Sequence, residues 1–503
     1  MLQQLDTVDS VRRNLAPRIE RNHKAKLGQF MTPSSVARFM ANMFPPSALQ
    51  TCRLLDAGAG MGALSCAFLD HWTARNFGFK TVEVTAYEID DALRGHLARH
   101  LSTYPNIRFN VMAGDYIELS TSTSDMFSVG HSLSGYTHAI LNPPYKKIPS
   151  NSFHRLALRR VGIEAVNLYS AFVALAVSQI VVGGQIVAII PRSFCNGPYY
   201  RPFRDFILER AAIRHIHLFE SRSKAFKDDE VLQENVIIRL ERGGLQGLVT
   251  ITTSTDDSFT DLAVHEHPFD RIVFPHDPER FIHVPTSPEK STIETLPAIR
   301  FTLADLGIQV STGPVVDFRL KEHLRDMPEA GTVPLVYPGH LNSTGTVWPM
   351  PGSKKPNAIL RNQTTEKWLY PNGFYCAVRR FSSKEEKRRV MASVVDPSSF
   401  RGHTALGFEN HINLFHENRH GLSEQIARGL TAFLNTTAVD ESFRRFNGHT
   451  QVNATDLKQM KYPSREVLIE LGQWAGQQDQ LTQGMMDEQL GKLLHDRQEE
   501  RAH

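Results

Sequence analysis

Cysteine is scarce in this chain: there are four among 503 residues, and no two are close enough to form a CxxC pair. Such scattered thiols exclude a disulfide framework and a cysteine-based zinc site, and they are typical of a reducing compartment. The first residues, MLQQLDTVDSVRRN, lack the apolar segment of a secretory signal peptide. We therefore expect a cytoplasmic protein.

Uninterrupted apolar runs of membrane-spanning length are also missing. The longest apolar stretch, residues 171–191, is broken by Gly183 and Gly184, and it predicts a buried helix, a turn and a buried strand. Four histidines lie between residues 265 and 283, but their spacing suits no standard zinc site. The sequence predicts neither a membrane span nor a bound metal.

An excess of charge of one sign is absent as well. Lys and Arg number 56 against 53 Asp and Glu, so the net charge is only +3 at pH 7. This balance neither requires nor excludes a nucleic-acid partner. Glycine and proline, at 32 and 27 residues, are not enriched as they are in fibrous or disordered chains. The length allows two or three domains, each with its own core.

Short apolar runs alternate with helical patterns between about residues 50 and 240. Seven such runs begin at Cys52, Thr81, Ile107, Thr137, Gly184, Ile213 and Asn235. Apolar strands separated by helices are typical of a parallel sheet that is covered on both faces. The pattern predicts a doubly wound α/β domain.

The pattern changes after this region. Residues 246–300 are rich in Gly, Ser, Thr, Pro and His, and we expect them to form a connecting segment. Residues 301–465 show short mixed elements with turn signals, which predicts an α+β domain. Residues 466–503 carry leucines at near-helical spacing and predict a C-terminal helical segment.

A glycine-rich turn follows the first predicted strand, in LLDAGAGMGALS. Asp56 ends the strand, and Gly58, Gly60 and Gly62 lead into a helix. Glycines allow a tight turn and let a ligand approach the backbone, while the helix N-terminus offers N–H groups. The turn lacks the GxGxxG spacing, which argues against a nicotinamide dinucleotide.

Acidic residues also end the next two predicted strands. Glu88 ends the second strand and Asp115 follows the third. The carboxyl ends of parallel strands meet at one edge of a sheet, where open α/β sheets bind their ligands, and an acid after the second strand can accept both hydroxyls of a ribose. These acids predict a site for a nucleoside without phosphates.

The fourth strand ends in the tetrapeptide Asn142, Pro143, Pro144 and Tyr145. The two prolines stiffen the loop and remove two backbone donors. The carbonyls of the Asn142 side chain and the Pro143 main chain could accept two hydrogen bonds from an exocyclic amine, and Tyr145 could stack on a planar base. Accepting both protons turns the amine lone pair toward an electrophile in the neighbouring crevice.

These motifs, in this order, resemble those of class I S-adenosylmethionine-dependent DNA adenine-N6 methyltransferases of restriction–modification systems, in the gamma-type motif order of the Eco57I- and TaqI-like group. LGQFMTPSSVARFMANMF (residues 27–44) resembles the family's N-terminal cofactor motif, and AFKDDEVLQENVII resembles its later base-packing motif. The resemblance implies a Rossmann-like methyltransferase domain with a mixed, mostly parallel doubly wound sheet, followed by an α+β target-recognition domain.

The resemblance also assigns roles to single residues. It implies S-adenosylmethionine as the cofactor, with Gln29 and Thr32 near its methionine part and Asp56, Gly58 and Gly60 around the turn beneath it. Glu88 would hold the ribose and Asp115 the cofactor adenine. Asn142, Pro143, Pro144 and Tyr145 would form the catalytic loop, with Tyr145 and Phe226 on either side of the flipped target base.

Double-stranded DNA is the partner that the resemblance implies. The basic arm of residues 1–26 and the cations Lys146, Lys147, Arg155 and Arg159 after the catalytic loop are candidates for phosphate contacts. The catalytic domain would span residues 27–245 and the recognition domain 301–465. Within that domain Gln451 and Asn453 are types that can read adenine edges, but we favour a structural role for both.

The resemblance further implies a separately encoded restriction endonuclease and a nucleoid-associated location in a bacterial or archaeal cytoplasm. The same tetrapeptide occurs in methyltransferases of RNA bases and of protein glutamine, since each target is an amine conjugated to a π system. A non-catalytic DNA-binding specificity subunit is a further alternative. A fused nuclease is disfavoured, because the ExK spacing of Glu385 and Lys387 is better explained by a charged helix.

Overall fold

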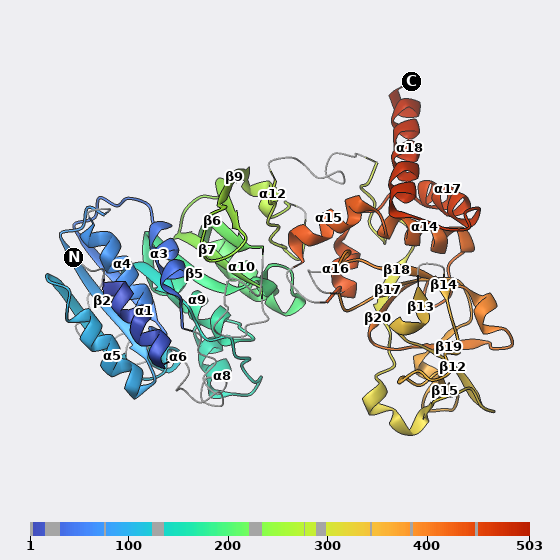
Figure 1. Ribbon diagram of the computed structural model, residues 1–503, viewed down its shortest axis with the longest axis horizontal. Coiled ribbons are helices and arrows are strands. Elements are labelled where there is room, and N and C mark those ends of the chain that lie inside the picture. Colours follow the sequence, from blue (N-terminus) through green and yellow to red (C-terminus); the bar gives the residue numbers. More distant parts are fainter. Residues whose placement is uncertain are drawn as a thin grey trace. The chain divides into compact units, whose positions relative to one another are not determined.

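The computed structural model describes residues 4–15, 31–74, 77–122, 135–220, 234–275, 277–287, 298–342, 345–382, 386–447 and 451–502. The chain divides into two compact units, Met1–Pro288 and Glu289–His503, called unit 1 and unit 2 below (Figure 1). None of the helices within the described ranges combines the length and the apolar character that a membrane crossing needs.

Unit 1 is built on a nine-stranded sheet with the order β3-β2-β1-β4-β5-β7-β6-β8-β9. The strands are β1 (Thr51–Ala57), β2 (Thr81–Glu88), β3 (Ile107–Ala113), β4 (Tyr136–Leu141), β5 (Ile180–Pro191), β6 (Ala211–Phe219), β7 (Asn235–Arg242), β8 (Leu248–Ser254) and β9 (Ala263–Pro268). The first five strands pair in parallel, and β7 runs antiparallel to both β5 and β6. The prediction of a mixed, mostly parallel sheet is confirmed.

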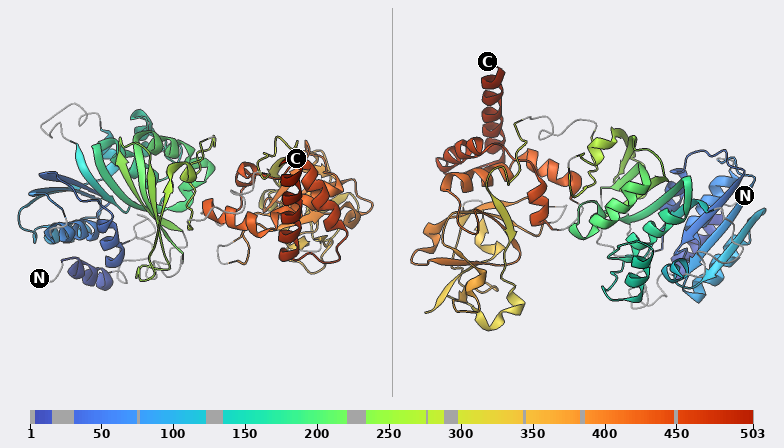
Figure 2. Two further views of the ribbon diagram at one scale, coloured as in Figure 1. Left: turned by 90° about the horizontal axis from the view of Figure 1, so that it is seen from above. Right: turned by 180° about the vertical axis from the view of Figure 1, so that it is seen from behind.

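Two hydrophobic cores cover the two faces of this sheet (Figure 2). Neighbouring residues of β1 belong to opposite cores, Leu54 to one and Leu55 to the other, because side chains alternate along a strand. The helices of the first core are α1 (Gln4–Leu15), α3 (Ser34–Asn42), α4 (Ala63–Thr73) and α5 (Asp91–Leu101). Those of the second are α6 (Tyr116–Thr121), α8 (Phe153–Arg160), α9 (Leu168–Gln179) and α10 (Arg201–Arg210). The domain is therefore doubly wound, as predicted.

The long apolar stretch of residues 171–191 forms a buried helix and a buried strand. Helix α9 ends at Gln179 and β5 begins at Ile180, so the turn predicted at the two glycines is wrong in place. Gly183, with φ +81°, and Gly184 lie within β5, at an irregularity of its pairing with β4. The predicted helix and strand are confirmed.

The structure differs from the prediction over residues 246–300. Instead of a simple connecting segment, this region supplies β8 and β9, which extend the sheet of unit 1. It also contains the short helix α12 (Phe269–Ile272). The strands are hard to recognise in the sequence because β8 is rich in threonine and β9 is a polar edge strand with only one buried residue.

Unit 2 combines small sheets with a set of helices. A four-stranded sheet has the order β10-β20-β17-β18, a five-stranded sheet the order β11-β15-β12-β19-β16, and β13 pairs with β14. The strands are β10 (Gln309–Thr312), β11 (Leu324–Arg325), β12 (Thr332–Val336), β13 (Leu341–Asn342), β14 (Gly345–Thr346), β15 (Ala358–Leu360), β16 (Leu369–Pro371), β17 (Tyr375–Arg379), β18 (Ala392–Val395), β19 (Ala405–Phe408) and β20 (Ile412–His416). The longer helices are α14 (Glu424–Leu434), α15 (Thr437–Phe446), α16 (Ala454–Gln459), α17 (Arg465–Gly476) and α18 (Gln483–Ala502).

The helices α17 and α18 lie where the sequence predicts a C-terminal helical segment. Helix α17 packs closely against α14, so it is part of unit 2 rather than an appendage. The mixture of short strands and helices agrees with the predicted α+β character of this unit.

Candidate active site

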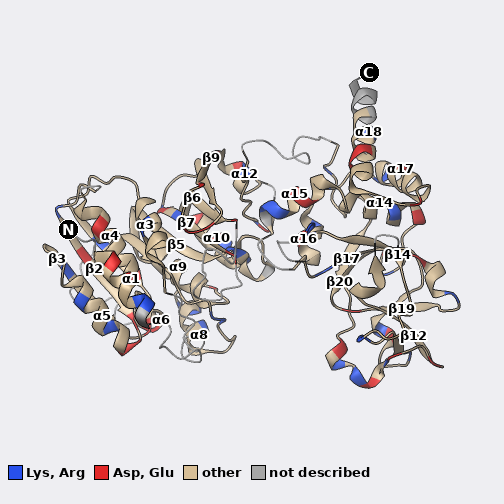
Figure 3. Ribbon diagram, viewed as in Figure 1, with Lys and Arg blue, Asp and Glu red and all other residues tan. Residues whose placement is uncertain are grey.

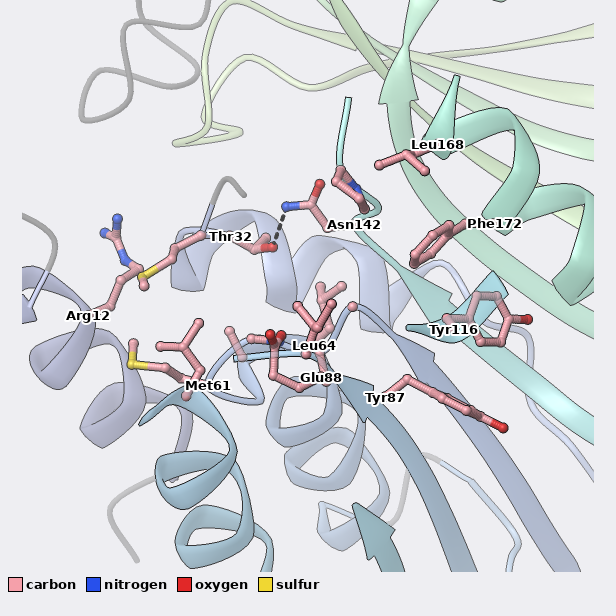
Figure 4. A pocket seen from close by; sticks show the side chains of 18 of the residues that line it. Arg12, Thr32, Met61, Leu64, Tyr87, Glu88, Tyr116, Asn142, Leu168 and Phe172 are labelled. Carbon is pink, nitrogen blue, oxygen red and sulfur yellow. Dashed lines mark hydrogen bonds between the residues drawn. The ribbon is translucent and has the colours of Figure 1, made fainter. Parts of the chain in front are cut away.

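A cavity of about 290 Å³ opens at the carboxyl ends of the central strands of unit 1 (Figure 4). It brings together eight of the residues singled out in the sequence: Thr32, Gly58, Gly60, Glu88, Asp115, Asn142, Pro144 and Lys146. Gln29 and Phe226 lie outside the described residues. The sheet topology explains why these residues lie together, because parallel strands place the loops after β1, β2, β3 and β4 on one edge.

The turn after β1 is held by the neighbouring strand. The backbone N–H groups of Gly58 and Ala59 both donate to the Tyr87 carbonyl at 2.9 Å. Gly58 and Gly60 have positive φ values, +79° and +55°, which residues other than glycine rarely adopt. A Cβ atom at Gly60 would meet nothing within 4 Å, so the turn borders open space. The glycines thus shape the floor of the cavity.

Glu88 is buried at the end of β2 and completes this turn. Its two carboxylate oxygens accept from Gly60 N and from Asp90 N, each at 2.8 Å. Burial raises the pKa of Glu88, and these backbone donors oppose the shift. The carboxylate is therefore fixed in direction at the cavity wall.

Asp56 is a different case from Glu88, although both acids end strands. It is fully buried, does not line the cavity, and accepts from the backbone N and the hydroxyl of Ser65, the latter at 2.6 Å. Burial raises its pKa to about 7. The expected cofactor contact is not what the structure shows: Asp56 supports the start of α4 beneath the turn.

Asp115 lies at the cavity, at the start of α6. Its Oδ1 accepts from Ile117 N at 2.8 Å and Glu118 N at 3.1 Å, which caps the helix. Its Oδ2 lies 3.3 Å from Nε2 of His154 on α8. His154 lines the cavity but carries no motif that would single it out in the sequence. The half-exposed Ile89, beside Glu88, also lines the cavity and was not predicted from the sequence.

The tetrapeptide after β4 contacts the N-terminal motif through one hydrogen bond. Asn142 Nδ2 donates to the buried Thr32 Oγ1 at 2.9 Å, drawn as a dashed line in Figure 4. Tyr145 OH donates to Asn142 Oδ1 at 3.3 Å, and the Tyr145 ring packs edge-on against Tyr169. Residues 110 positions apart thus determine how the Asn142 amide is oriented.

The predicted phosphate contacts divide into two groups. Lys146 and Lys147 are exposed beside the tetrapeptide. Arg155 is buried, and both it and Arg159 pair with Glu164, which lowers the pKa of that carboxyl. Arg155 is therefore wrong as a phosphate candidate, and Arg159 already has a protein partner.

The prediction that the basic arm of residues 1–26 contacts DNA phosphates is also corrected in part. Helix α1 packs into the core of unit 1 through Leu5 and Val8, and buried Arg12 donates to Asp9 at 2.8 Å. Arg13 also pairs with Asp9, at 2.8 Å. The cations of the arm from Arg18 onward lie outside the described residues. Elsewhere Lys and Arg are mixed with Asp and Glu over both units (Figure 3).

The described residues contain no group of three or more His, Cys, Asp or Glu that could hold a metal ion. What the cavity presents instead is two directed carboxylates, a glycine turn and a stiff loop with an oriented amide. Fold and cavity together define a doubly wound α/β domain with a candidate ligand site at the carboxyl ends of its strands.

Comparison with known proteins narrows this class. Residues 93–226 match the family model described as Eco57I restriction-modification methylase. The chain is 52% identical over 500 residues to the Type II methyltransferase M.BsuBI of Bacillus subtilis, covering 98% of this chain and 99% of that protein. It is 43% identical to the Type II methyltransferase M.PstI of Providencia stuartii, covering 92% of each.

A solved structure supports the fold of the whole chain. The DrdV–DNA complex superposes with a TM-score of 0.57 and 13% sequence identity, covering 94% of this chain and 59% of that one. The chain belongs to the Type II methyltransferases of restriction–modification systems. This family implies S-adenosylmethionine as the cofactor, which agrees with the prediction.

Proposed function

We propose that the chain transfers a methyl group from S-adenosylmethionine to the N6 amine of an adenine in duplex DNA, at one specific sequence. The observation that carries the proposal is the Asn142 amide, which lies at the end of β4 on the same cavity as Glu88 and Asp115. Thr32 holds its nitrogen, so the carbonyl oxygen is the end directed to an incoming amine.

The cavity fits a nucleoside cofactor without phosphates. Its strand-end acids, Glu88 and Asp115, suit hydroxyl and amine donors. Glu88 would hold the ribose and Asp115 the cofactor adenine. The turn at Gly58 to Gly60 and Thr32 would hold the methionine part. When bound, S-adenosylmethionine supplies an electrophilic methyl group.

The catalytic loop supplies the second half of the reaction. Asn142 Oδ1 and the Pro143 carbonyl would accept hydrogen bonds from the two N–H groups of the target amine, which turns its lone pair out of conjugation and toward the cavity. After methyl transfer the amine nitrogen would release one of its protons to water. Tyr145 OH donates a hydrogen bond to Asn142 Oδ1 in this structure. This hydrogen bond would break when the target amine binds to the same oxygen. No acid or base in the loop is needed for this activation.

The target base must leave the duplex to reach this loop, since its amine cannot approach the cavity while it is stacked and paired. Tyr145 would then stack on the base, with Phe226 as the second aromatic. Lys146 and Lys147, which are exposed, would contact the flanking phosphates.

The biological role follows from the family. We propose that the chain is the modification component of a restriction–modification system, that a separately encoded endonuclease cuts the unmodified sequence, and that it acts on chromosomal DNA in a bacterial or archaeal cytoplasm. Unit 2 would recognise the target sequence. Relatives named as Type II methyltransferases match nearly the full length of the chain, which argues against the RNA, protein-glutamine and non-catalytic alternatives.

The experiment is product identification. Purified chain is incubated with unmethylated bacterial DNA and methyl-labelled S-adenosylmethionine, and the nucleosides are separated by mass spectrometry. The label should appear in N6-methyldeoxyadenosine. Label in a methylated cytosine, or transfer to RNA but not to DNA, would contradict the proposal.

A further inference from the structure

Four segments of unit 2 meet to form a surface of directed polar groups. We call it the Lys355 surface; it comprises Asp317, Phe318, Lys355, Phe381 and His411. Backbone hydrogen bonds join two of its segments, from Val315 N to the Phe408 carbonyl at 3.1 Å and from Asn410 N to the Val315 carbonyl at 2.9 Å.

Lys355 is exposed but held in one direction. Its Nζ donates to Asp317 Oδ2 at 2.7 Å and lies 5.3 Å from the centre of the buried Tyr337 ring, while half of the side chain remains accessible. This contact lowers the pKa of Asp317, which therefore stays charged beside the lysine. A cation and an acceptor are thus presented side by side.

His411 is held in the same manner. Its Nδ1 lies 2.7 Å from the Glu409 carboxylate, which is fully buried, whereas 40% of the histidine side chain is exposed. Because Nδ1 is engaged, Nε2 is the ring nitrogen that remains for an outside partner. The buried carboxylate fixes the direction of an exposed ring.

Two aromatic rings flank these polar groups. Phe318 is 64% exposed and Phe381 is 37% exposed. An arginine lies over each ring, Arg319 at 5.4 Å and Arg380 at 5.9 Å from the centroid, and the Phe381 ring lies 4.8 Å from that of His411. Exposed aromatic rings next to cations suit a partner that is both flat and anionic.

The loop that carries Lys355 is anchored from within. Asn357 is buried; its Oδ1 accepts from Met350 N and its Nδ2 donates to the Asp326 carbonyl, each at 2.8 Å. An ordinary surface ion pair lacks such buried support. Lys492 and Glu488 on α18, for example, are 61% and 68% exposed, so neither side chain is buried. The Lys355 surface is preorganised, which reduces the entropy cost of binding.

We propose that the Lys355 surface reads the target sequence of duplex DNA, with Lys355 and His411 contacting base edges and Phe318 packing beside them. The proposal rests on the proposed function. Lysine donates to guanine O6 and N7, and carboxylates such as Asp317 accept from cytosine N4. Lys354 and Arg319 are neighbours of Lys355 and Phe318 in the sequence, and cations there would complement the phosphate backbone.

Gln451 and Asn453 are of types that can read adenine edges, but their contacts are within the protein. Gln451 accepts through Oε1 from Arg380, and Asn453 caps α16 together with Asp456. The preference for a structural role of these two residues agrees with these contacts.

The test uses the full chain with Phe318→Ala and Lys355→Gln, both at exposed positions, and Lys492→Gln as the matched control. His411 is kept, because its loss would leave the buried Glu409 carboxylate unpaired. Once sequencing has identified the motif that the wild type methylates, affinities are measured for a duplex with this motif and for one with the same bases scrambled. Isothermal titration with S-adenosylmethionine alone checks that unit 1 is intact.

The ratio of the two affinities should fall at least about fivefold in each variant, with cofactor affinity unchanged and Lys492→Gln like the wild type. An unchanged ratio would overturn the proposal, and so would equal weakening on both duplexes, which marks phosphate contact alone. A wild type that methylates no duplex would instead contradict the proposed function, so the two failures are distinguishable.

Discussion

One hydrogen bond decides which end of the Asn142 amide meets the cavity. Asn142 Nδ2 donates to Thr32 Oγ1 at 2.9 Å, and Oδ1 accepts from Tyr145 OH at 3.3 Å; under the proposed function this oxygen would accept from the target amine. We therefore propose Thr32 as a positioning residue for the tetrapeptide loop, in addition to its role as a candidate cofactor contact. The N-terminal motif and the tetrapeptide are therefore linked directly by this hydrogen bond.

Thr32→Val tests this role, since it keeps the shape of the side chain and removes the acceptor. We expect kcat to fall by about three- to tenfold, the usual effect of losing one such hydrogen bond, while the KM for DNA changes little. Single-turnover kinetics with saturating cofactor measures the effect. Thr32→Ser, which retains the hydroxyl, should restore most of the rate; an equally slow serine variant would contradict the positioning role.

Asp56 predicts a pH dependence of stability. Its pKa is raised from 3.8 to about 7 by burial, so between these values the folded state holds a proton that the unfolded chain has released. Stability from this group is therefore complete below about pH 4 and is lost as the pH rises to about 7.

Asp56→Asn removes this titration and keeps an acceptor for Ser65. The melting temperature of the variant minus that of the wild type should rise from pH 4 to pH 7 and then level off. The difference cancels the titration of groups common to both proteins. A difference that stays constant over this range would show that Asp56 is charged throughout.

The sequence places strand-end acids correctly but cannot tell their roles apart. Asp56 and Glu88 follow apolar strands in the same way, yet Ser65 from the next helix satisfies the first, while the second faces the cavity. Arg155 likewise looks like any exposed cation until Glu164 folds back onto it. Such partners depend on three-dimensional packing and leave no local pattern.

At the scale of elements, the crossing of α14 and α17 leaves no room for a side chain at the two glycines that form it. Gly429 and Gly472 face each other there: a Cβ at Gly472 would lie 1.8 Å from the Gln425 carbonyl, and one at Gly429 equally close to that of Leu468. Only glycine lets the two backbones approach this closely.

Gly472→Ala should therefore destabilise unit 2 by about 1–3 kcal/mol, since the helices must move apart. Gly491→Ala on α18 is the matched control, because its Cβ would meet nothing within 4 Å, and helix propensity predicts a gain of roughly 0.5–1 kcal/mol. Urea unfolding of the full chain, followed by tryptophan fluorescence, compares the two. Equal stability of both variants would contradict the close crossing.

Element prediction succeeds where apolar periodicity is strong. The strands β1 to β7 follow continuous apolar runs, and all seven were expected. Strands β8 and β9 were not, because threonine and alternating polar residues at a sheet edge resemble a loop. The strands of unit 2 have only two to five residues, such as β11 and β17, and are too short for any periodic signal.

At the scale of the whole molecule, the chain divides into a unit that carries the reaction site and a unit with the Lys355 surface. The division near residue 288 agrees with the change at about residue 300 from a segment rich in Gly, Ser, Thr, Pro and His to short mixed elements. Motif order indicated the enzyme class, because the acids, the glycine turn and the tetrapeptide converge only in a doubly wound sheet. The recognition residues could not be predicted, since they come from three segments about 35 to 95 residues apart.

The central claim is methyl transfer to adenine N6 through the Asn142 loop. Single-molecule sequencing of genomic DNA from cells that express the chain, as wild type or as Asn142→Ala, tests it most directly. We predict N6-methyladenine at every copy of one short motif with the wild type and none with Asn142→Ala, although the purified variant still binds S-adenosylmethionine. Glu88→Ala should instead lose cofactor affinity. Persistent methylation by Asn142→Ala, or no modified adenine from wild-type protein that binds the cofactor, would contradict the account.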